Sequence, residues 1–502
     1  MKRFHVARHR SAAFVFAIAL PSALIACSSS SDEPTPDASS DVGGDSTPDV
    51  APDTHVDAAP EADAAAEADT SVDSAPEADA TPTDTAPEAD AVGEVAADAT
   101  ETGDTADASE TATDASDASD AADDTTVDAD ASGETATDAA GDGCVGASCG
   151  GVAVHISLGW HHSCAQLSTG TVKCWGDNQF GQLGVGTSDL QLSTPTDVPL
   201  LTNVTNLALG YSHTCVRLAD STMQCWGDDL FGELGDPEFT AALSNAPIPV
   251  PGPTDIASIA LGYGDTCALY TSQTLQCWGP NDQGQLGDGT TSARNVPTAV
   301  STIIDAVEIA FGDHHACARR AGGTVVCWGN NGSGQLGDGT TTERDLPTPV
   351  SGITNAVQLS LGQAHSCAVL ADATVMCWGN NDFGQLGFNS TATTLTPTAV
   401  AGLTGVKQVA LGQLHTCALM TDGTAKCWGF NDDGELGDAS NNEHHAPVSV
   451  SSLTGAHEIA AGRFHTCARF DAGAVSCWGN NDGGQLGDGT LTPRNAPTPV
   501  KF

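Results

Sequence analysis

Residues 477–490 read CWGNNDGGQLGDGT, and close versions of this stretch occur seven times in the 502-residue chain. The cysteines that open the copies are 50 to 52 residues apart. A period of this length indicates stacked or radially arranged supersecondary units. The segments between the copies are short, rich in Val, Thr and Ala, and divided by Gly, Asn and Asp, which is typical of strands and turns.

The number and length of the repeats favour a closed ring. Seven units of this size, each with room for four strands, match the blades of a β-propeller. A linear solenoid would need distinct polar caps at its ends, and neither terminal repeat has a cap-like sequence. Residues 497–502 can supply a strand beside the first unit. The sequence therefore predicts an all-β fold, a seven-bladed β-propeller over residues 144–502.

The first 27 residues read as a targeting segment, because a basic stretch precedes the apolar run AAFVFAIALPSALIA. The ending Leu-Ile-Ala-Cys resembles the lipobox of bacterial lipoproteins, which implies a signal peptide over 1–26 and acylation of Cys27. An ordinary secretory signal with a chance cysteine is the alternative. Because the residue after Cys27 is Ser28 and not Asp, the resemblance to lipoproteins favours sorting to the outer membrane. We therefore expect a lipid-anchored protein of the bacterial cell envelope.

Residues 28–143 contain 34 acidic residues, no Lys or Arg and no aromatic residue. Such a tract cannot bury enough apolar surface to offset the entropy of ordering, and its like charges extend it. We expect a disordered acidic spacer over 27–143. Residues 144–502 carry 31 acidic and 12 basic residues, a balance that opposes binding to a phosphate backbone. Nucleic acid is therefore not an expected partner.

Each repeat also holds a second cysteine, ten residues before the first. The midpoint of Cys417 and Cys427 is Asp422, so a hairpin with a three-residue loop would place the two cysteines opposite each other. Such a loop favours a left-handed glycine at its third position. Four repeats have one there: Gly170, Gly323, Gly423 and Gly473.

We expect these cysteines to form disulfides, because an exported protein meets an oxidising compartment. Reduced thiols and a metal site are the alternatives, although Cys-x9-Cys is not a zinc spacing. A further disulfide is expected at the spacer boundary. The predicted pairs are Cys144–Cys149, Cys164–Cys174, Cys215–Cys225, Cys267–Cys277, Cys317–Cys327, Cys367–Cys377, Cys417–Cys427 and Cys467–Cys477.

The repeats resemble those of the regulator of chromosome condensation family. The residues that carry the likeness are Gly-x-x-His-x-Cys-Ala, as in GQLHTCAL at 412–419, then CWGNN..GQLGDGT and PTPV, and it covers 151–502. Family members form seven-bladed propellers, so the resemblance implies that the motif glycines turn corners and pack blades. A calcium loop is the alternative, but the alternating oxygen ligands and terminal Glu are missing. The family includes nuclear exchange factors, but we do not expect an exported, acidic chain to share that function, because a fold alone does not determine function.

A histidine lies two residues before the upstream cysteine of each pair in six repeats, as His162 does before Cys164, and Asp265 replaces it in the third repeat. We expect each histidine to hydrogen-bond within its own blade, since a metal site would need several to converge on the channel. No triad order, nucleophile elbow, zinc-protease motif or phosphate loop is present. The sequence thus predicts no enzyme, cofactor or metal. The histidines are His162, His213, His315, His365, His415 and His465.

The two residues between Gly and His differ among the copies, and by pseudo-symmetry they ring a single face. Aromatic residues and Arg, which dominate binding hot spots, are frequent among them. The candidate partner-binding residues are Trp160, His161, Tyr211, Tyr263, Asp313, His314, Gln363, Gln413, Arg463 and Phe464. A second variable set lies in the loop after each CWG motif. The alternative interpretation is that these are ordinary exposed or half-packed loop residues. The set is Asp177, Phe180, Asp228, Leu230, Phe231, Pro280, Phe383 and Phe430.

These features together predict a surface-tethered, non-enzymatic binding module whose propeller face recognises a protein. The membrane is expected to be contacted through the lipid anchor only. Carbohydrate or cell-wall binding is the alternative, since aromatic residues on a propeller rim also serve that purpose. Near-identical Trp and Asn pockets in every blade would favour sugar, whereas the variable pairs favour one asymmetric protein ligand.

Overall fold

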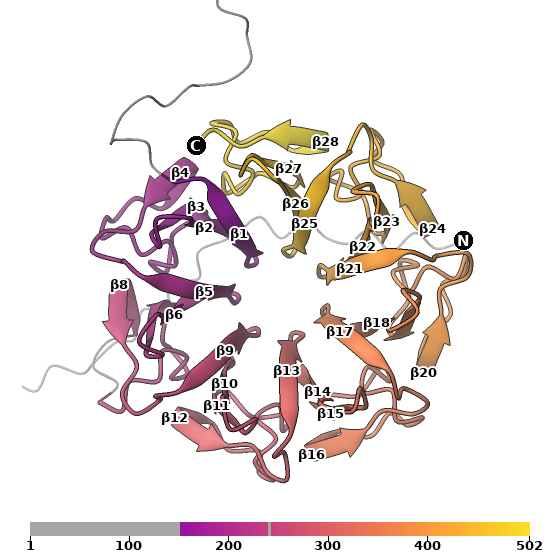
Figure 1. Cartoon of the computed structure of the whole chain (residues 1–502), viewed down its shortest axis with the longest axis horizontal. Coiled ribbons are helices and arrows are strands. Elements are labelled where there is room, and N and C mark those ends of the chain that lie inside the picture. The colour runs from indigo at the N-terminus through magenta and orange to yellow at the C-terminus, as the bar shows by residue number, and fades with distance from the viewer. Residues whose placement is uncertain (1–150, 239–241) are drawn as a thin grey trace, which may run out of the picture. The chain divides into compact units, whose positions relative to one another are not determined.

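The computed structural model describes residues 151–238 and 242–502, which form a seven-bladed β-propeller of 28 strands. Each blade is a four-stranded sheet in which consecutive strands pair antiparallel. Figure 1 shows that the first strand of every blade is innermost. The all-β propeller fold predicted from the repeats is thus confirmed. The signal peptide, Cys27, the spacer and the Cys144–Cys149 pair lie outside the described residues.

The strand bounds follow the sequence repeat. Blades 1 and 2 contain β1 (Ala153–Leu158), β2 (His162–Leu167), β3 (Val172–Asp177), β4 (Gln191–Asp197), β5 (Val204–Leu209), β6 (His213–Leu218), β7 (Met223–Asp228) and β8 (Leu243–Pro249). Blades 3 and 4 contain β9 (Ile256–Leu261), β10 (Thr266–Tyr270), β11 (Leu275–Gly279), β12 (Arg294–Ala299), β13 (Ala306–Phe311), β14 (His315–Arg320), β15 (Val325–Gly329) and β16 (Arg344–Pro349). Blades 5 to 7 contain β17 (Ala356–Leu361), β18 (His365–Leu370), β19 (Val375–Gly379), β20 (Thr394–Ala399), β21 (Val406–Leu411), β22 (His415–Met420), β23 (Ala425–Gly429), β24 (His444–Ser449), β25 (Ala456–Ala461), β26 (His465–Phe470), β27 (Val475–Gly479) and β28 (Arg494–Pro499).

The ring closes by packing of the last blade against the first. Strand β28 pairs with β27 of its own blade, and β25 packs against β1. Phe502 lies edge-on to Trp175, with ring centroids 5.9 Å apart. Trp175 also donates its indole N–H to the carbonyl oxygen of Gln485 at 2.9 Å. The C-terminal segment therefore lies beside the first unit, as the sequence predicted, and each blade is one uninterrupted repeat.

Seven disulfides join the second and third strands of the blades, which confirms the predicted hairpin pairs. In each pair the two cysteines are direct cross-strand partners with Cα atoms 4.1 Å apart. This separation is that of a non-hydrogen-bonded antiparallel pair, where the backbones approach most closely. All fourteen cysteines are buried, so each disulfide lies within the core of its blade.

The hairpin loops also have the predicted backbone conformation. Gly423 at the third loop position has a φ of 78°, and Gly170, Gly323 and Gly473 are similar. The three repeats without glycine adopt the same left-handed conformation, with φ of 66°, 66° and 61° at Ser221, Gln273 and Ala373. The hairpin geometry is therefore set by the loop length, and glycine only relieves its steric cost.

The CWG tryptophans show that the repeated motif is mainly architecture. All seven are buried, and each donates its indole N–H to a backbone carbonyl oxygen of the preceding blade; Trp428, for example, bonds Gln385 at 2.8 Å. Gly387 packs directly on this ring, since a Cβ there would lie 2.8 Å from the indole nitrogen. The motif therefore joins one blade to the next. The second Asn of the motif bonds within its own loop, as Asn381 does with the carbonyl oxygens of Ser390 and Ala392.

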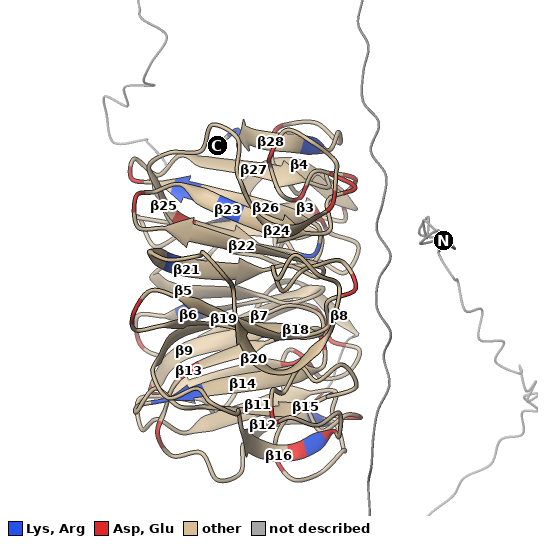
Figure 2. Cartoon of the chain, turned by 90° about the vertical axis from the view of Figure 1, so that its right-hand side faces the viewer, with Lys and Arg blue, Asp and Glu red and all other residues tan. Residues whose placement is uncertain are grey.

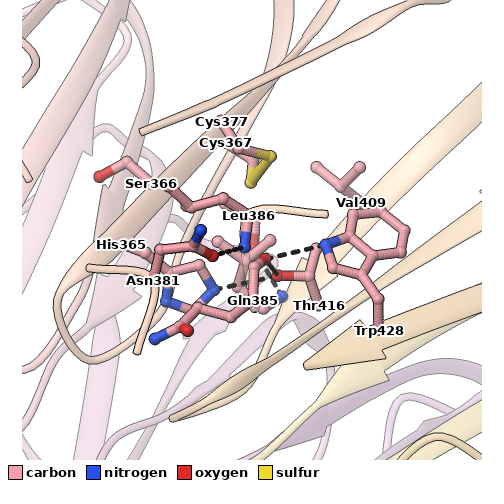
Figure 3. Close-up of a disulfide and its surroundings, with 12 residues drawn as sticks. His365, Ser366, Cys367, Cys377, Asn381, Gln385, Leu386, Val409, Thr416 and Trp428 are labelled. Atoms are coloured by element: carbon pink, nitrogen blue, oxygen red, sulfur yellow. Dashed lines mark hydrogen bonds between the residues drawn. A yellow bond between two sulfur atoms is a disulfide. The ribbon is translucent and has the colours of Figure 1, made fainter. Parts of the chain in front are cut away.

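The prediction that each histidine bonds its own blade is wrong. His365 Nε2 lies 3.0 Å from Thr416 Oγ1 of the next blade, and this hydroxyl donates to the carbonyl oxygen of Gln385 (Figure 3). The hydroxyl oxygen therefore accepts the N–H of a neutral imidazole. Each histidine begins the second strand at a blade boundary, where a cross-blade hydroxyl is the nearest partner. Five other pairs match: His162–Thr214, His213–Thr266, His315–Ser366, His415–Thr466 and His465–Ser163.

Candidate functional site

Two sets of connections form one end of the propeller, which we call the variable face. The inner connection of each blade joins its first and second strands and carries the Gly-x-x-His turn, and the outer connection joins the third and fourth strands. In an antiparallel blade these two connections lie at the same end. A backbone bond fixes them together, since Asp177 N–H donates to the carbonyl oxygen of His161 at 2.8 Å. Figure 2 shows acidic residues mainly in the connections between strands, at both ends of the propeller.

The inner connections hold seven candidate residues around the central axis. The turns lie directly on the buried histidines, because a Cβ at Gly412 would lie 2.1 Å from the His415 ring. Glycine is therefore required there, and the next side chain of each turn points to the mouth of the channel. A pocket of about 120 Å³ opens between these side chains, which are Trp160, Tyr211, Tyr263, Asp313, Gln363, Gln413 and Arg463.

One side of this pocket is a series of side chains in ring-to-ring contact, edge-to-face between Trp160 and Tyr211 and tilted between the following rings. The Arg463 guanidinium lies 3.9 Å above the Trp160 ring, and the Trp160 and Tyr211 centroids are also 3.9 Å apart. The series continues from Tyr211 to Tyr263 at 4.5 Å and from Tyr263 to His314 at 5.3 Å. Five consecutive blades, from blade 7 around to blade 4, thus contribute one aromatic arc.

The other side of the pocket is polar. Arg463 Nε donates to Gln413 Oε1 at 2.6 Å, which fixes the guanidinium over the Trp160 ring. Burial raises the pKa of the Asp313 carboxyl, and the backbone N–H of Asp313 donates to the Gln363 carbonyl oxygen at 3.3 Å. The mouth is therefore chemically asymmetric, with rings on one side and amides and a carboxyl on the other.

The second residues of the variable pairs lie farther from the axis. Phe464 contacts Phe430, with centroids 5.8 Å apart, and the Arg463 guanidinium lies 4.7 Å from the Phe464 ring. His161 is held against Arg463 at 3.5 Å, and burial, followed by the Arg463 charge, lowers the pKa of His161 to about 4. These side chains connect the inner arc to the outer connections.

The second variable set contributes two kinds of residue. Asp177 and Asp228 accept backbone N–H groups two residues ahead and so shape their turns. The large apolar residues lie on the variable face; Phe231, for example, is 52% exposed. Phe383 lies 5.3 Å from Phe430, and Phe231 and Pro280 line a second pocket with Tyr263 and His314. Phe180 and Leu230 are exposed as well.

Sequence reasoning missed a group of buried acids at blades 2 and 3. Glu233 replaces the motif glutamine, and burial raises its pKa to about 7. Asp265 is fully buried; its burial, and then the nearby Glu233, raise the pKa of its carboxyl well above the usual range. Neither Asp265 oxygen has a hydrogen-bond partner among the described residues. The signal was present in the sequence, since GELG replaces GQLG in two repeats and Asp replaces His in one.

A family model described as the RCC1-like domain matches residues 126–375 and 305–502. The chain belongs to the RCC1-like domain family. Within residues 151–238 and 242–502, no helix is long and apolar enough to cross a membrane. The same residues contain no group of three or more His, Cys, Asp or Glu side chains placed to hold a metal ion.

Curated relatives share short stretches with this RCC1-like chain. The ultraviolet-B receptor UVR8 of Arabidopsis thaliana is 32% identical over 141 residues, which is 28% of this chain and 32% of the receptor. The probable E3 ubiquitin-protein ligase HERC4 of Homo sapiens is 32% identical over 149 residues, 28% of this chain and 13% of the ligase. The matched stretches thus span a third or less of these relatives.

Solved structures show the same fold. Human WBSCR16 is 23% identical, with a TM-score of 0.61, and the match covers 66% of this chain and 95% of that protein. Prp20p of Saccharomyces cerevisiae is 22% identical, with a TM-score of 0.60, and covers 70% and 88% of the two chains. The likeness lies in the propeller architecture.

Proposed function

We propose that this chain is a non-enzymatic binding module whose variable face recognises a protein. The observation that carries the proposal is the aromatic arc that runs from Arg463 through Trp160, Tyr211 and Tyr263 to His314. Tyr, Trp and Arg are the residues that dominate hot spots, because they combine large contact area with a polar group. An arc across five blades suits a ligand as wide as a protein segment.

The scaffold beneath the arc supports this function. A disulfide in every blade and cross-blade hydrogen bonds such as His365–Thr416 hold the inner connections in place. A preorganised surface loses little conformational entropy on binding, so more of the contact energy appears as affinity. The structurally similar Prp20p has binding properties toward Gsp1p and histones, which supports protein recognition as a use of this fold.

We further propose that the protein is held at the bacterial outer membrane by acylated Cys27, with the acidic spacer extending the propeller from the surface. This part rests on the lipobox-like ending and the composition of residues 27–143. Labelling with a radioactive fatty acid tests it. The full chain should incorporate label and fractionate with outer membranes, whereas Cys27→Ser should do neither; equal labelling of both would contradict the anchor.

The binding test captures partners on the immobilised, oxidised full chain from envelope and secreted extracts. The variant Trp160→Ala/Tyr211→Ala interrupts the arc. A matched control, Leu200→Ala/Ile304→Ala, removes two exposed apolar residues from connections between blades at the opposite end. We expect one dominant protein that is retained by the control and lost by the arc variant, with unchanged unfolding midpoints. Capture of glycan alone, or of the same proteins by both variants, would refute the proposal.

A further inference from the structure

A second pocket on the variable face lies where blades 2, 3 and 4 meet. Its walls include Phe231 from blade 2, Tyr263 and Pro280 from blade 3, and His314 from blade 4. Asp282, exposed on the outer connection of blade 3, lies at the same pocket. The pocket therefore combines three aromatic rings with a carboxylate.

A comparison between blades explains why the pocket is open. Phe383, Phe430 and Phe464 hold the equivalent positions in blades 5, 6 and 7, and there Phe430 packs between the other two rings. Pro280 stands where blade 6 has Phe430. The smaller proline leaves the space between Phe231 and His314 unfilled.

The electrostatic surroundings of the pocket are acidic. Burial, and then the charge of Asp313, raise the pKa of the Tyr263 phenol; Asp228 and Glu233 act in the same direction, and Arg463 opposes them. Arg463 is the single Lys or Arg in the described inner and outer connections of all seven blades, and it is already stacked on Trp160. Neither Lys nor Arg lines this pocket, and His314 is its one residue with a basic side chain.

We propose that this pocket receives the cationic side chain of a Lys or Arg in a basic segment of the partner protein. The proposal rests on the proposed function and names the chemistry that the variable face recognises. Aromatic rings attract a cation through their negative faces, and the attraction grows as the site loses water. Asp282 adds a direct charge partner. A carboxylate ligand would instead meet the like charge of Asp282 and no Lys or Arg, so the geometry favours a basic ligand over an acidic one.

The test uses the three tyrosines of the chain. Labelling the oxidised full chain with 3-fluorotyrosine gives separate signals for Tyr211, Tyr263 and Tyr270, and Tyr263→Phe assigns the reporter. The probe is acetyl-Gly-Lys-Gly-amide, compared with the same peptides carrying norleucine or Glu in place of Lys. We expect the Lys peptide to shift the Tyr263 signal saturably and the Tyr270 signal not at all, with neither comparison peptide doing so.

Matched variants separate the pocket from general attraction to an acidic protein. Phe231→Ala should weaken binding by about 3- to 30-fold, whereas Phe383→Ala, the equivalent change in blade 5, should leave it unchanged. Asp282→Asn should weaken binding and Asp382→Asn should not. Pro280→Phe should abolish binding by filling the pocket, and it should fold because phenylalanine occupies this position in blade 6.

Three results would overturn the inference: no saturable shift at Tyr263, equal binding of the norleucine peptide, or equal binding by Pro280→Phe and the unaltered chain. Each of these leaves the proposed function intact if the capture experiment still yields a partner that depends on Trp160 and Tyr211. A failed capture together with a saturable Lys-peptide shift would instead refute the protein partner while retaining the cation pocket.

Discussion

Asp265 of blade 3 and Ala316 of blade 4 occupy the positions at which the six other blade boundaries join a histidine to a hydroxyl. Both partners of the cross-blade hydrogen bond are therefore absent at this boundary. The Asp265 carboxyl is left buried, without a hydrogen-bond partner among the described residues. A buried polar group without a partner costs about 1–3 kcal/mol.

Restoring the pair should stabilise the propeller. We expect Asp265→His/Ala316→Thr to raise the free energy of unfolding by about 1–3 kcal/mol, since it removes the unpaired carboxyl and adds a hydrogen bond. Guanidinium titration with disulfides intact measures this. Ala316→Thr alone should change the free energy of unfolding little, because the new hydroxyl would have no imidazole to bond with. Equal stability of the double variant and the unaltered chain would show that Asp265 is satisfied in another way.

The buried histidines should make stability fall in acid. Burial lowers the pKa of His365 and four of its equivalents to about 3, against 6.5 in the unfolded chain, and lowers that of His465 well below 6.5. Between these values the unfolded chain binds more protons, so stability is present above pH 6.5 and is lost as pH falls. Each histidine contributes up to about 1.4 kcal/mol per pH unit.

The matched variant for this pH dependence is His365→Gln, which keeps a donor but does not titrate. Its free energy of unfolding should fall less steeply between pH 6.5 and 4 than that of the unaltered chain. The buried Glu233 and Glu435 act in the opposite direction, because burial raises their pKa values to about 7 and about 8. A rise in stability toward pH 4 would mean that these carboxyls outweigh the histidines.

Placing glycine at the third position of a hairpin loop that lacks it should stabilise the propeller. Ala373 has a φ of 61°, a left-handed conformation that costs a residue with a Cβ about 1–2 kcal/mol. Ala373→Gly should therefore stabilise the fold by about 0.5–1 kcal/mol after the entropy cost of glycine. Gly423→Ala should destabilise it by more than that, because its Cβ would also lie 2.9 Å from the backbone of Gly455. Denaturant midpoints of the two variants should move in opposite directions; movement in the same direction would rule out backbone strain as the cause.

Removing one disulfide should weaken but not unfold the ring. Closing so short a loop is worth about 2–3 kcal/mol in the chain-entropy model, so Cys367→Ala/Cys377→Ala should lower the free energy of unfolding by that amount. Thiol titration of the folded variant should find the other described disulfides intact, because their sulfur atoms are buried. Loss of all cooperativity would show that the disulfide acts beyond its own blade.

The local features of the fold were predictable, and contacts between blades were not. The ten-residue spacing of Cys417 and Cys427 determines hairpin length and therefore their pairing, which is a property of neighbouring residues. The bond from His365 to Thr416 depends on how two sheets pack, which the pattern within one repeat does not reveal. The same holds for the edge-to-face contact between Trp160 and Tyr211.

The candidate face was predicted in the same partial way. Variation among repeats located its residues, since positions free of the shared architecture are the ones that differ. It did not show that Pro280 opens a pocket that Phe430 fills in blade 6, because this depends on side-chain volumes at a three-blade junction. The acids Glu233 and Asp265 were visible as departures from the repeat, but their burial was not.

Each blade is one uninterrupted repeat, and Phe502 packs on Trp175 where the last blade meets the first. Joining the two ends of the ring and cutting at the exposed Ile304, between β12 and β13, would leave every four-stranded sheet whole. A circular permutant made in this way should therefore fold into the same seven-bladed ring. By the same reasoning, a recombination event that moves a complete repeat exchanges one sector of the variable face without dividing any sheet.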